Sequence, residues 1–202
     1  MPTKNRQEWV PRAIRCFQDQ TYVHRELLIL DNGDSIQDLI PPYGRIRYVR
    51  MAGDHKIGNL RNYCCQMARG EFIAHWDDDD WSHPNRLQAQ IGSLQGLDVT
   101  VFSSMYFHGP GKEVKLYTAP AGHGLGTSLF YRRSWWEQNK FSPQHIGEDA
   151  VFMQRSAGNI VFSARTDLMV ASTHPNNSSK RQSGAKEWKK AHPEQLPEGY
   201  PF

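Results

Sequence analysis

The sequence lacks the features of a membrane-spanning, disulfide-linked or nucleic-acid-binding protein. Its 202 residues contain no secretory leader and no apolar run of the roughly 20 residues that cross a bilayer. The three cysteines, Cys16, Cys64 and Cys65, have no CxxC spacing and indicate neither a disulfide framework nor a zinc knuckle. The formal net charge of +3 is too small to indicate nucleic acid as a partner. We therefore expect one cytoplasmic domain, with or without a tail.

Strand-like and helix-like segments alternate along the chain. Strand patterns occur at 27–30, 45–51, 71–76, 98–107, 126–134 and 159–172, and helical patterns at 10–19, 57–70, 83–96, 134–139 and 148–158. This alternation predicts an α/β fold with a mostly parallel central sheet flanked by helices. From Pro175 onward the chain is polar and aperiodic. We expect a folded domain over 1–177 and an extended or partly disordered tail over 178–202.

Four consecutive aspartates, Asp77–Asp80, follow the third predicted strand. Asp31 likewise follows the first predicted strand, at an Asn32-Gly33 turn. Ligands of parallel α/β sheets gather at the carboxyl ends of strands, so both acidic groups are expected at one edge. Carboxylates held there suit Mg²⁺ or Mn²⁺, with phosphate oxygens filling the open coordination positions. The pattern excludes an EF-hand, whose glycine and distal glutamate are missing, and a solvated acidic loop is the alternative interpretation.

The acid run belongs to an ordered series of motifs. In chain order these are "PTKNR", "ILDNGD", "GNLRNYCCQMARGEFIAHWDDDDW", "HPNRLQAQ", "GTSLFYRRSWW", "GEDAVFMQRS" and "STHPNN". Together they resemble a family 2 inverting nucleotide-sugar glycosyltransferase of the GT-A fold, over about residues 2–177. The acid run alone is weak evidence, whereas chance rarely supplies the whole series in this order.

The resemblance implies a nucleotide site built from the first half of the chain. Thr3 matches the Pro-Thr loop that lies against the nucleotide, and Asp31 matches the acid that hydrogen-bonds the base, commonly uracil. Arg61 matches the arginine that contacts the nucleotide and its diphosphate. Asp79, supported by Asp77, is expected to contact the ribose. Since four acids stand in a row, the register of this motif stays open.

The same resemblance implies a metal site and a general base. Asp79 and Asp80 are expected to hold Mn²⁺ or Mg²⁺, and His174 matches a late histidine that approaches the metal or diphosphate. Asp149 takes the place of the catalytic base, while the neighbouring Glu148 orients the acceptor or caps a helix. Local evidence alone favours an N-terminal capping pair at Glu148-Asp149 and a structural histidine at 174.

The implied reaction moves a sugar from a nucleoside-diphosphate sugar, in the first instance a UDP-sugar, to an acceptor hydroxyl with inversion. The acceptor is a glycan, a lipid-linked glycan or another hydroxyl compound. A cytoplasmic location, or peripheral contact with the inner face of a membrane, fits this reaction. The basic residues of the tail are expected to be solvated, to close over the diphosphate or to touch anionic lipid; they are Lys180, Arg181, Lys186, Lys189 and Lys190.

One departure from the family and several ordinary interpretations stand beside these roles. Family members begin with an apolar strand such as "VSVIIPTYN", whereas this chain begins "MPT", so we expect the first strand to be missing. Arg61 has the alternative role of a surface arginine, and Asp31 that of a turn former. Cys64 and Cys65 are expected in the core, and Trp135 and Trp136 in helix-to-sheet packing or a sugar-stacking wall.

Two competing classes share this fold. A nucleotidyltransferase would carry a glycine-rich loop near its N-terminus, and "PTKNRQEW" has no glycine. A degenerate module that binds nucleotide or glycan without catalysis is favoured by the missing first strand. The intact acid run and the Glu148-Asp149 pair favour the enzyme.

Overall fold

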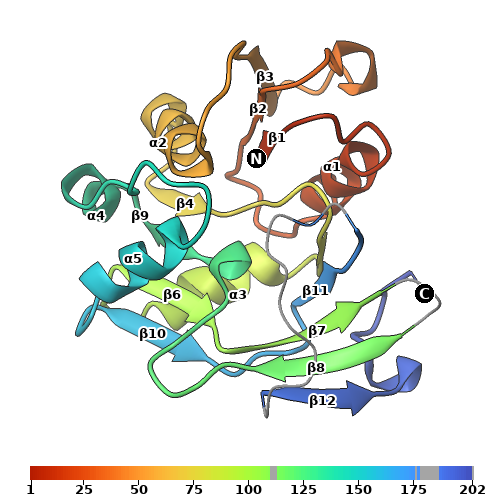
Figure 1. The fold of residues 1–202 in the computed structure, drawn as a ribbon, viewed down its shortest axis with the longest axis vertical. Helices are drawn as coiled ribbons and strands as arrows, with labels where there is room; N and C mark the ends of the chain where they lie inside the picture. Colours follow the sequence, from red (N-terminus) through yellow and green to blue (C-terminus); the bar gives the residue numbers. More distant parts are fainter. Residues whose placement is uncertain (110–112, 176, 178–186, 202) are drawn as a thin grey trace.

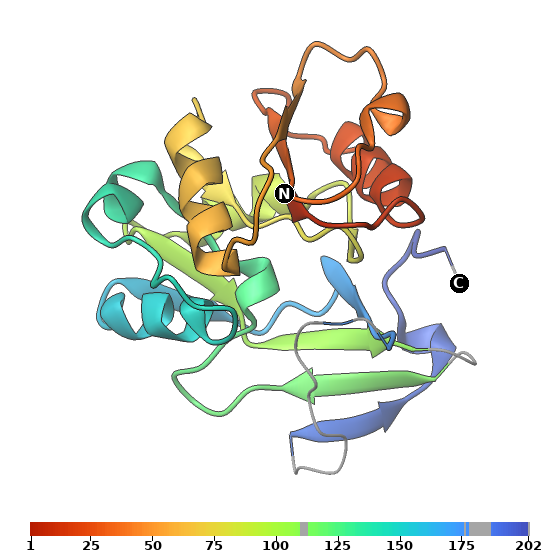
Figure 2. The same ribbon diagram turned by 45° about the horizontal axis from the view of Figure 1, so that its top comes forward.

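The structure is a computed structural model that describes residues 1–109, 113–175, 177 and 187–201. Its α/β architecture agrees with the alternation of the sequence. A three-stranded parallel sheet lies at one end of the molecule, and a five-stranded ladder that includes β7, β8 and β12 lies at the other (Figure 1, Figure 2). A four-stranded sheet, flanked by helices α2, α4 and α5, lies between them.

The three-stranded sheet is ordered β1-β2-β3 and is parallel throughout. Its strands are β1 (Pro2–Thr3), β2 (Leu27–Asp31) and β3 (Ile46–Arg50). All five residues of β2 are buried, as expected for its unbroken apolar run. The sheet is covered by α1 (Val10–Gln18), which places Val10, Ala13, Ile14, Cys16 and Phe17 in the core.

A two-residue strand, β1, forms where the sequence predicted that the first strand is missing. In β1, Pro2 pairs with Leu30 and Thr3 with Asp31, both parallel to β2. The Met1 amino group also donates to the Leu28 carbonyl at 2.8 Å. The backbone of β2 supplies hydrogen-bond partners for this two-residue segment. The expectation of an absent first strand was therefore wrong.

The four-stranded sheet has the order β10-β6-β9-β4. Its strands are β4 (Phe72–Ala74), β6 (Val99–Phe102), β9 (Phe130–Arg132) and β10 (Ile160–Ser163). The adjoining helices are α2 (Ile57–Met67), α4 (Arg133–Gln138) and α5 (Glu148–Arg155). Cys65 and Trp136 are buried in the core between these layers. Burial raises the pKa of the Cys65 thiol to about 12, which suits a packing role.

The five-stranded sheet has the order β12-β8-β7-β11-β5. Its strands are β5 (Trp81–Ser82), β7 (Ser104–His108), β8 (Val114–Thr118), β11 (Met169–Ser172) and β12 (Trp188–Ala191). Helix α3 (Arg86–Ser93) follows β5, and short 3₁₀ turns lie at η1 (Gln37–Leu39), η3 (Gly126–Ser128) and η4 (Pro193–Gln195).

Strand pairing is mixed, not mostly parallel. Among the described strands four pairings are parallel and five are antiparallel. The antiparallel pairs include β7 with β8, which a short connection joins, and β9 with both β4 and β6. Short connections favour antiparallel neighbours, whereas apolar patterning alone does not give the pairing direction.

The C-terminal segment is not a free tail where the structure describes it. Strand β12 pairs antiparallel with β8, and the Tyr200 ring packs edge-on against Trp81 with ring centroids 5.4 Å apart. Of the predicted extended or partly disordered tail, residues 188–191 are extended, as a paired strand, and the expectation of disorder was wrong for residues 187–201. Of the basic residues assigned to the tail, Lys180, Arg181 and Lys186 lie outside the described residues. The domain boundary at 177 stays a prediction. No helix in the described ranges has the length and apolarity to cross a membrane.

Candidate functional site

The acid run lies in the segment between β4 and β5, which crosses the middle of the molecule towards β11 (Figure 1). Asp78, Asp79 and Asp80 are buried, whereas the side chain of Asp77 is 29% exposed. Burial of three adjacent carboxylates is incompatible with the solvated-loop interpretation. Each of the four acids has a different set of partners, and these partners come from distant parts of the chain.

Asp77 is connected to the Glu148-Asp149 pair through Arg61. The Arg61 Nε atom donates to Glu148 Oε1 at 3.0 Å, and its Nη1 atom lies 3.7 Å from Asp77 Oδ1. Burial alone would lower the pKa of Arg61, but the Asp77 and Glu148 charges raise it above its ordinary value. Burial raises the pKa of Glu148, against the opposing effect of Arg61. Arg61, whose side chain is 10% exposed, is thus the centre of an ion-pair group and not the surface arginine of the alternative interpretation.

Asp78 is held by the N-terminal strand. Thr3 Oγ1 donates to Asp78 Oδ2 at 2.6 Å, and both residues are buried. Burial raises the pKa of Asp78 to about 6, while the Thr3 hydrogen bond acts in the opposite direction. The same strand register places Thr3 beside Asp31. Asp78 was not among the predicted site residues, because a run of four identical acids does not show which of them reaches Thr3.

Asp79 meets His174 at a point where charges are crowded. The His174 Nε2 atom lies 2.9 Å from Asp79 Oδ2 and 3.0 Å from Arg6 Nη1, and Arg6 is 3.7 Å from the same Asp79 oxygen. A carboxylate only accepts hydrogen bonds, and a guanidinium only donates them. The single His174 Nε2 atom can therefore either donate to Asp79 or accept from Arg6, but cannot do both at once. Trp9 stacks on the His174 ring at a centroid distance of 4.8 Å and fixes its plane.

Asp80 is the most enclosed of the four acids. Thr127 Oγ1 donates to its Oδ2 atom at 2.5 Å, and the backbone amide of Ser172 donates to its Oδ1 atom at 3.0 Å. Burial and the neighbouring Asp79 and Asp77 charges raise the pKa of Asp80 to about 8. Both oxygens of Asp80 therefore have protein donors, and the structure does not bring this residue to His174.

Asp31 and Asp149 complete the set of predicted site residues. Asp31 is buried at the end of β2, where the Tyr48 hydroxyl donates to Oδ2 at 2.6 Å and the Gly33 amide to Oδ1 at 2.9 Å. These bonds fit the turn-forming role and leave the base contact untested. Asp149 is half-buried in the first turn of α5 and packs against Gly126. A Cβ atom on Gly126 would lie 1.7 Å from Asp149 Oδ2.

Two arginines, the buried Arg86 and the partly buried Arg12, support the acid run and were not recognised in the sequence. Arg86 is 1% exposed, and its guanidinium donates to the His75 carbonyl at 2.7 Å and to Ser82 Oγ at 2.9 Å. Burial lowers the pKa of Arg86 to about 10, although the charges of Asp77 and Asp80 act to raise it. Arg12 donates to the Asp79 carbonyl and to Ser172 Oγ. Arg86 follows His83 by three positions, and nothing in the local sequence pattern indicates that its side chain is buried.

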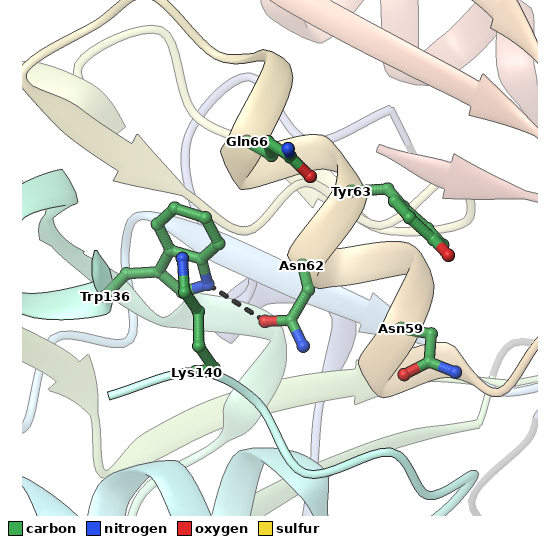
Figure 3. Close-up of a pocket in the computed structure, with 6 residues that line it drawn as sticks. All are labelled: Asn59, Asn62, Tyr63, Gln66, Trp136 and Lys140. Atoms are coloured by element: carbon green, nitrogen blue, oxygen red, sulfur yellow. Dashed lines mark hydrogen bonds between the residues drawn. The ribbon is translucent and has the colours of Figure 1, made fainter. Parts of the chain in front are cut away.

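A separate pocket lies on the outer side of α2 (Figure 3). Asn59, Asn62, Tyr63 and Gln66 project into it from the helix, opposite Trp136 and Lys140. Trp136 Nε1 donates to Asn62 Oδ1 at 3.0 Å, and Trp136 is only 4% exposed. This burial favours packing over a sugar-stacking wall. No predicted site residue lines this pocket.

Comparison with known proteins decides the family. The model of the family described as "Glycosyl transferase family 2" matches residues 1–157. This chain belongs to glycosyl transferase family 2. A relative in Escherichia coli (strain K12), the putative colanic acid biosynthesis glycosyl transferase WcaA, is 30% identical over 146 residues, which cover 69% of this chain and 52% of the relative. The putative glycosyltransferase EpsE of Bacillus subtilis (strain 168) is 26% identical over 98 residues, 45% of this chain and 35% of the relative.

Solved structures of other proteins share the fold. TarS 1-349 from S. aureus in complex with UDP-GlcNAc has a TM-score of 0.72 at 15% identity, over 90% of this chain and 60% of that chain. A mannosyltransferase from Pyrobaculum calidifontis in complex with GDP-Man and Mn²⁺ has a TM-score of 0.66 at 13% identity, over 85% and 55%. The predicted GT-A class of α/β fold is therefore confirmed. This chain spans about half or less of the length of the two curated relatives.

Proposed function

We propose that this chain transfers a sugar from a nucleoside-diphosphate sugar, in the first instance a UDP-sugar, to an acceptor hydroxyl with inversion. The observation that carries the proposal is the convergence of motifs from the whole chain on the acid run. Three different aspartates of the run are contacted directly, by Thr3, Arg61 and His174. Glu148 is connected to the run through Arg61. Family membership, and the similar structures solved in complex with UDP, UDP-GlcNAc or GDP-Man, support it further.

The residues present fit a divalent cation at Asp79 and His174. A carboxylate oxygen and an imidazole nitrogen lie 2.9 Å apart, a separation that suits two neighbouring ligands of one ion. Among the described residues no group of three or more His, Cys, Asp or Glu side chains could hold a metal. Two protein ligands suit Mn²⁺ or Mg²⁺, which bind phosphate oxygens and water in their other positions. Asp79 and His174 would hold the ion, and Asp80 would not.

When bound, the ion would stabilise negative charge on the leaving diphosphate. Arg61 lies between the acid run and α5, and in our proposal its charge faces the same diphosphate. Its ion pair with Glu148 keeps the guanidinium in place at 3.0 Å. Because Glu148 is 5% exposed and pairs with Arg61, it is unsuited to receive a proton from the acceptor. We assign it a positioning role.

Asp149 is the better candidate for the general base. It is adjacent to Glu148 but half-buried, and no described residue donates a hydrogen bond to its Oδ2 atom. Asp149 would accept the proton of the acceptor hydroxyl as the hydroxyl oxygen attacks the anomeric carbon from the face opposite the diphosphate. A single displacement of this kind inverts the anomeric configuration. Cytoplasmic location, peripheral membrane contact and the nature of the acceptor remain predictions.

A donor screen tests the proposal. UDP-, GDP- and dTDP-sugars are incubated with the purified chain, each with and without Mn²⁺, and the released nucleoside diphosphate is measured. Calorimetry with UDP and Mn²⁺ measures binding separately from turnover. We expect metal-dependent UDP binding and slow hydrolysis or transfer of a UDP-sugar. Binding without turnover of any donor would favour the non-catalytic module, and absence of nucleotide binding would refute the transferase and leave a module that binds glycan.

A further inference from the structure

The turn η3 lies between Asp80, the last residue of the acid run, and Asp149, the proposed general base. Thr127, its central residue, donates to Asp80 at 2.5 Å. Gly126, its first residue, packs so closely on Asp149 that a Cβ atom would overlap the carboxylate. Two consecutive residues of one turn therefore contact the end of the acid run and the candidate base. The contacts differ in kind, since one is a hydrogen bond and the other is close packing that requires the absence of a side chain.

The backbone of this turn is held from behind by buried side chains. The carbonyls of Gly126, Thr127 and Ser128 each accept a hydrogen bond from a side chain, and the donors come from β4's end and α3. These bonds are His75 Nδ1 to Gly126 at 2.8 Å, Arg86 Nη2 to Thr127 at 3.3 Å and Gln90 Nε2 to Ser128 at 2.7 Å. His75, Arg86 and Gln90 are at most 4% exposed. Buried hydrogen bonds of this kind are costly to break, so the turn is fixed.

The three donors are also hydrogen-bonded to other residues, and Arg86 connects the other two. A carbonyl only accepts, so His75 carries its proton on Nδ1 and its Nε2 atom accepts from the Tyr131 hydroxyl at 3.4 Å. Arg86 bonds the His75 carbonyl and the Gln90 side chain as well as the turn. The three donors thus form one connected set.

From this arrangement we propose that the turn Gly126–Ser128 is a rigid spacer that sets the position of Asp149 relative to the acid run. Thr127, His75, Arg86 and Gln90 are then positioning residues for the transfer reaction, and none of them touches substrate. The catalytic part of this inference rests on the proposed function, but the structural part does not. A displacement of about 1 Å in a reacting group can cost roughly 10²-fold in rate, which makes such a spacer consequential.

The first test separates the two contacts of the turn by their kinetic effects. Gly126→Ala displaces the Asp149 carboxylate and should lower kcat about 10²-fold, with the affinity for UDP and Mn²⁺ within about twofold of the parent. Gly92→Ala is the matched control, because a Cβ atom on Gly92 meets nothing within 4 Å; it should leave both quantities unchanged. A Gly126→Ala variant with parental turnover, or one that loses affinity and rate in parallel, would overturn the proposal.

The second test needs neither donor nor turnover. Thr127→Val removes the hydroxyl that holds Asp80, and Asp80→Asn removes its charge. In urea unfolding of the metal-free chain, we expect these two changes to be non-additive by about tenfold in the unfolding equilibrium constant, because they act on the same hydrogen bond: Thr127→Val removes its donor and Asp80→Asn weakens its acceptor. Thr127→Ser keeps the hydroxyl and should behave as the parent. The control is Thr100→Val, a buried threonine whose hydroxyl bonds Ser93 at 3.1 Å; it should add to Asp80→Asn without coupling.

The outcomes distinguish a failure of the spacer proposal from a failure of the proposed function. Additivity of Thr127→Val with Asp80→Asn refutes the spacer while leaving the proposed function intact. A parent chain that neither binds UDP nor releases nucleoside diphosphate from any donor refutes the proposed function, and the unfolding cycle still decides whether Thr127 holds Asp80.

Discussion

Replacing Asp149 by asparagine separates chemistry from binding at the candidate site. The Asp149 Oδ1 atom accepts the Ala150 amide at 2.8 Å, and an asparagine oxygen can take over this bond. The amide has the shape of the carboxylate and fits against Gly126, so the fold should be retained. What is lost is the capacity to accept a proton. General-base contributions are about 10²- to 10⁴-fold, or roughly 3–5 kcal/mol of activation free energy.

We expect Asp149→Asn to lower kcat by about that factor, with little change in the KM for the donor. The assay is release of nucleoside diphosphate at saturating acceptor, with a circular dichroism melt to check folding. Glu148→Gln is the matched neighbour: it removes one of the two negative charges that pair with Arg61 and leaves only Asp77 to compensate the guanidinium. That variant should lose stability and donor affinity. Near-parental turnover of Asp149→Asn, or retention of configuration in the product, would show that the base or the mechanism is wrong.

Three further predictions concern the metal and the buried groups. Donor turnover should stop when EDTA removes divalent ions and return with Mn²⁺ or Mg²⁺; full turnover of metal-free protein would contradict the proposed cation site. Asp79→Asn should weaken UDP binding in the presence of Mn²⁺, whereas Asp80→Asn should change it much less, because both oxygens of Asp80 already have protein donors; calorimetry on both variants decides this. Burial lowers the pKa of His75 well below its ordinary value of 6.5, so its contribution to folding is complete above about pH 6.5 and is lost as the pH falls toward the lowered pKa. The stability difference between the parent and His75→Asn in urea unfolding should therefore shrink from pH 7 to pH 5, and a constant difference would argue against a neutral, buried imidazole.

The sequence predicted which acids gather at the candidate site because its strongest signals are local. A fully apolar strand that ends in Asp31, and a second strand that ends in the acid run, predict acids at one sheet edge, and β1 does place Thr3 beside Asp31 while it holds Asp78. Family membership, confirmed over residues 1–157, rests on the same ordered motifs. The individual partners of the four aspartates were not predictable. Neighbouring positions in such a run are chemically identical, and only the path of the backbone decides which carboxylate faces which element.

The turn at η3 shows why the supporting residues escaped prediction. The segment Gly126–Ser134 has the apolar and β-branched content of a strand, but only Phe130–Arg132 pairs as one. The residues before it form a 3₁₀ turn because their carbonyls bond side chains that are 38 to 51 positions away in sequence. Contacts of such separation leave no periodicity in the local pattern. The same reason applies to β12, whose polar sequence lacks strand character and which is ordered by pairing with β8.

The charges around the acid run bear on the proposed cation. The acid run and the Glu148-Asp149 pair supply six carboxylates, and four arginines contact or flank them: Arg6, Arg12, Arg61 and Arg86. With all six carboxylates ionised, they carry two more negative charges than the four arginines carry positive charges. One divalent ion would balance this excess. In the metal-free protein, burial and, after it, the neighbouring aspartate charges raise the pKa of Asp78 and Asp80, so protonation is the alternative way to reduce the negative charge. Metal binding near Asp79 should therefore release protons from this cluster, as expected where cation and proton compete for the same carboxylates.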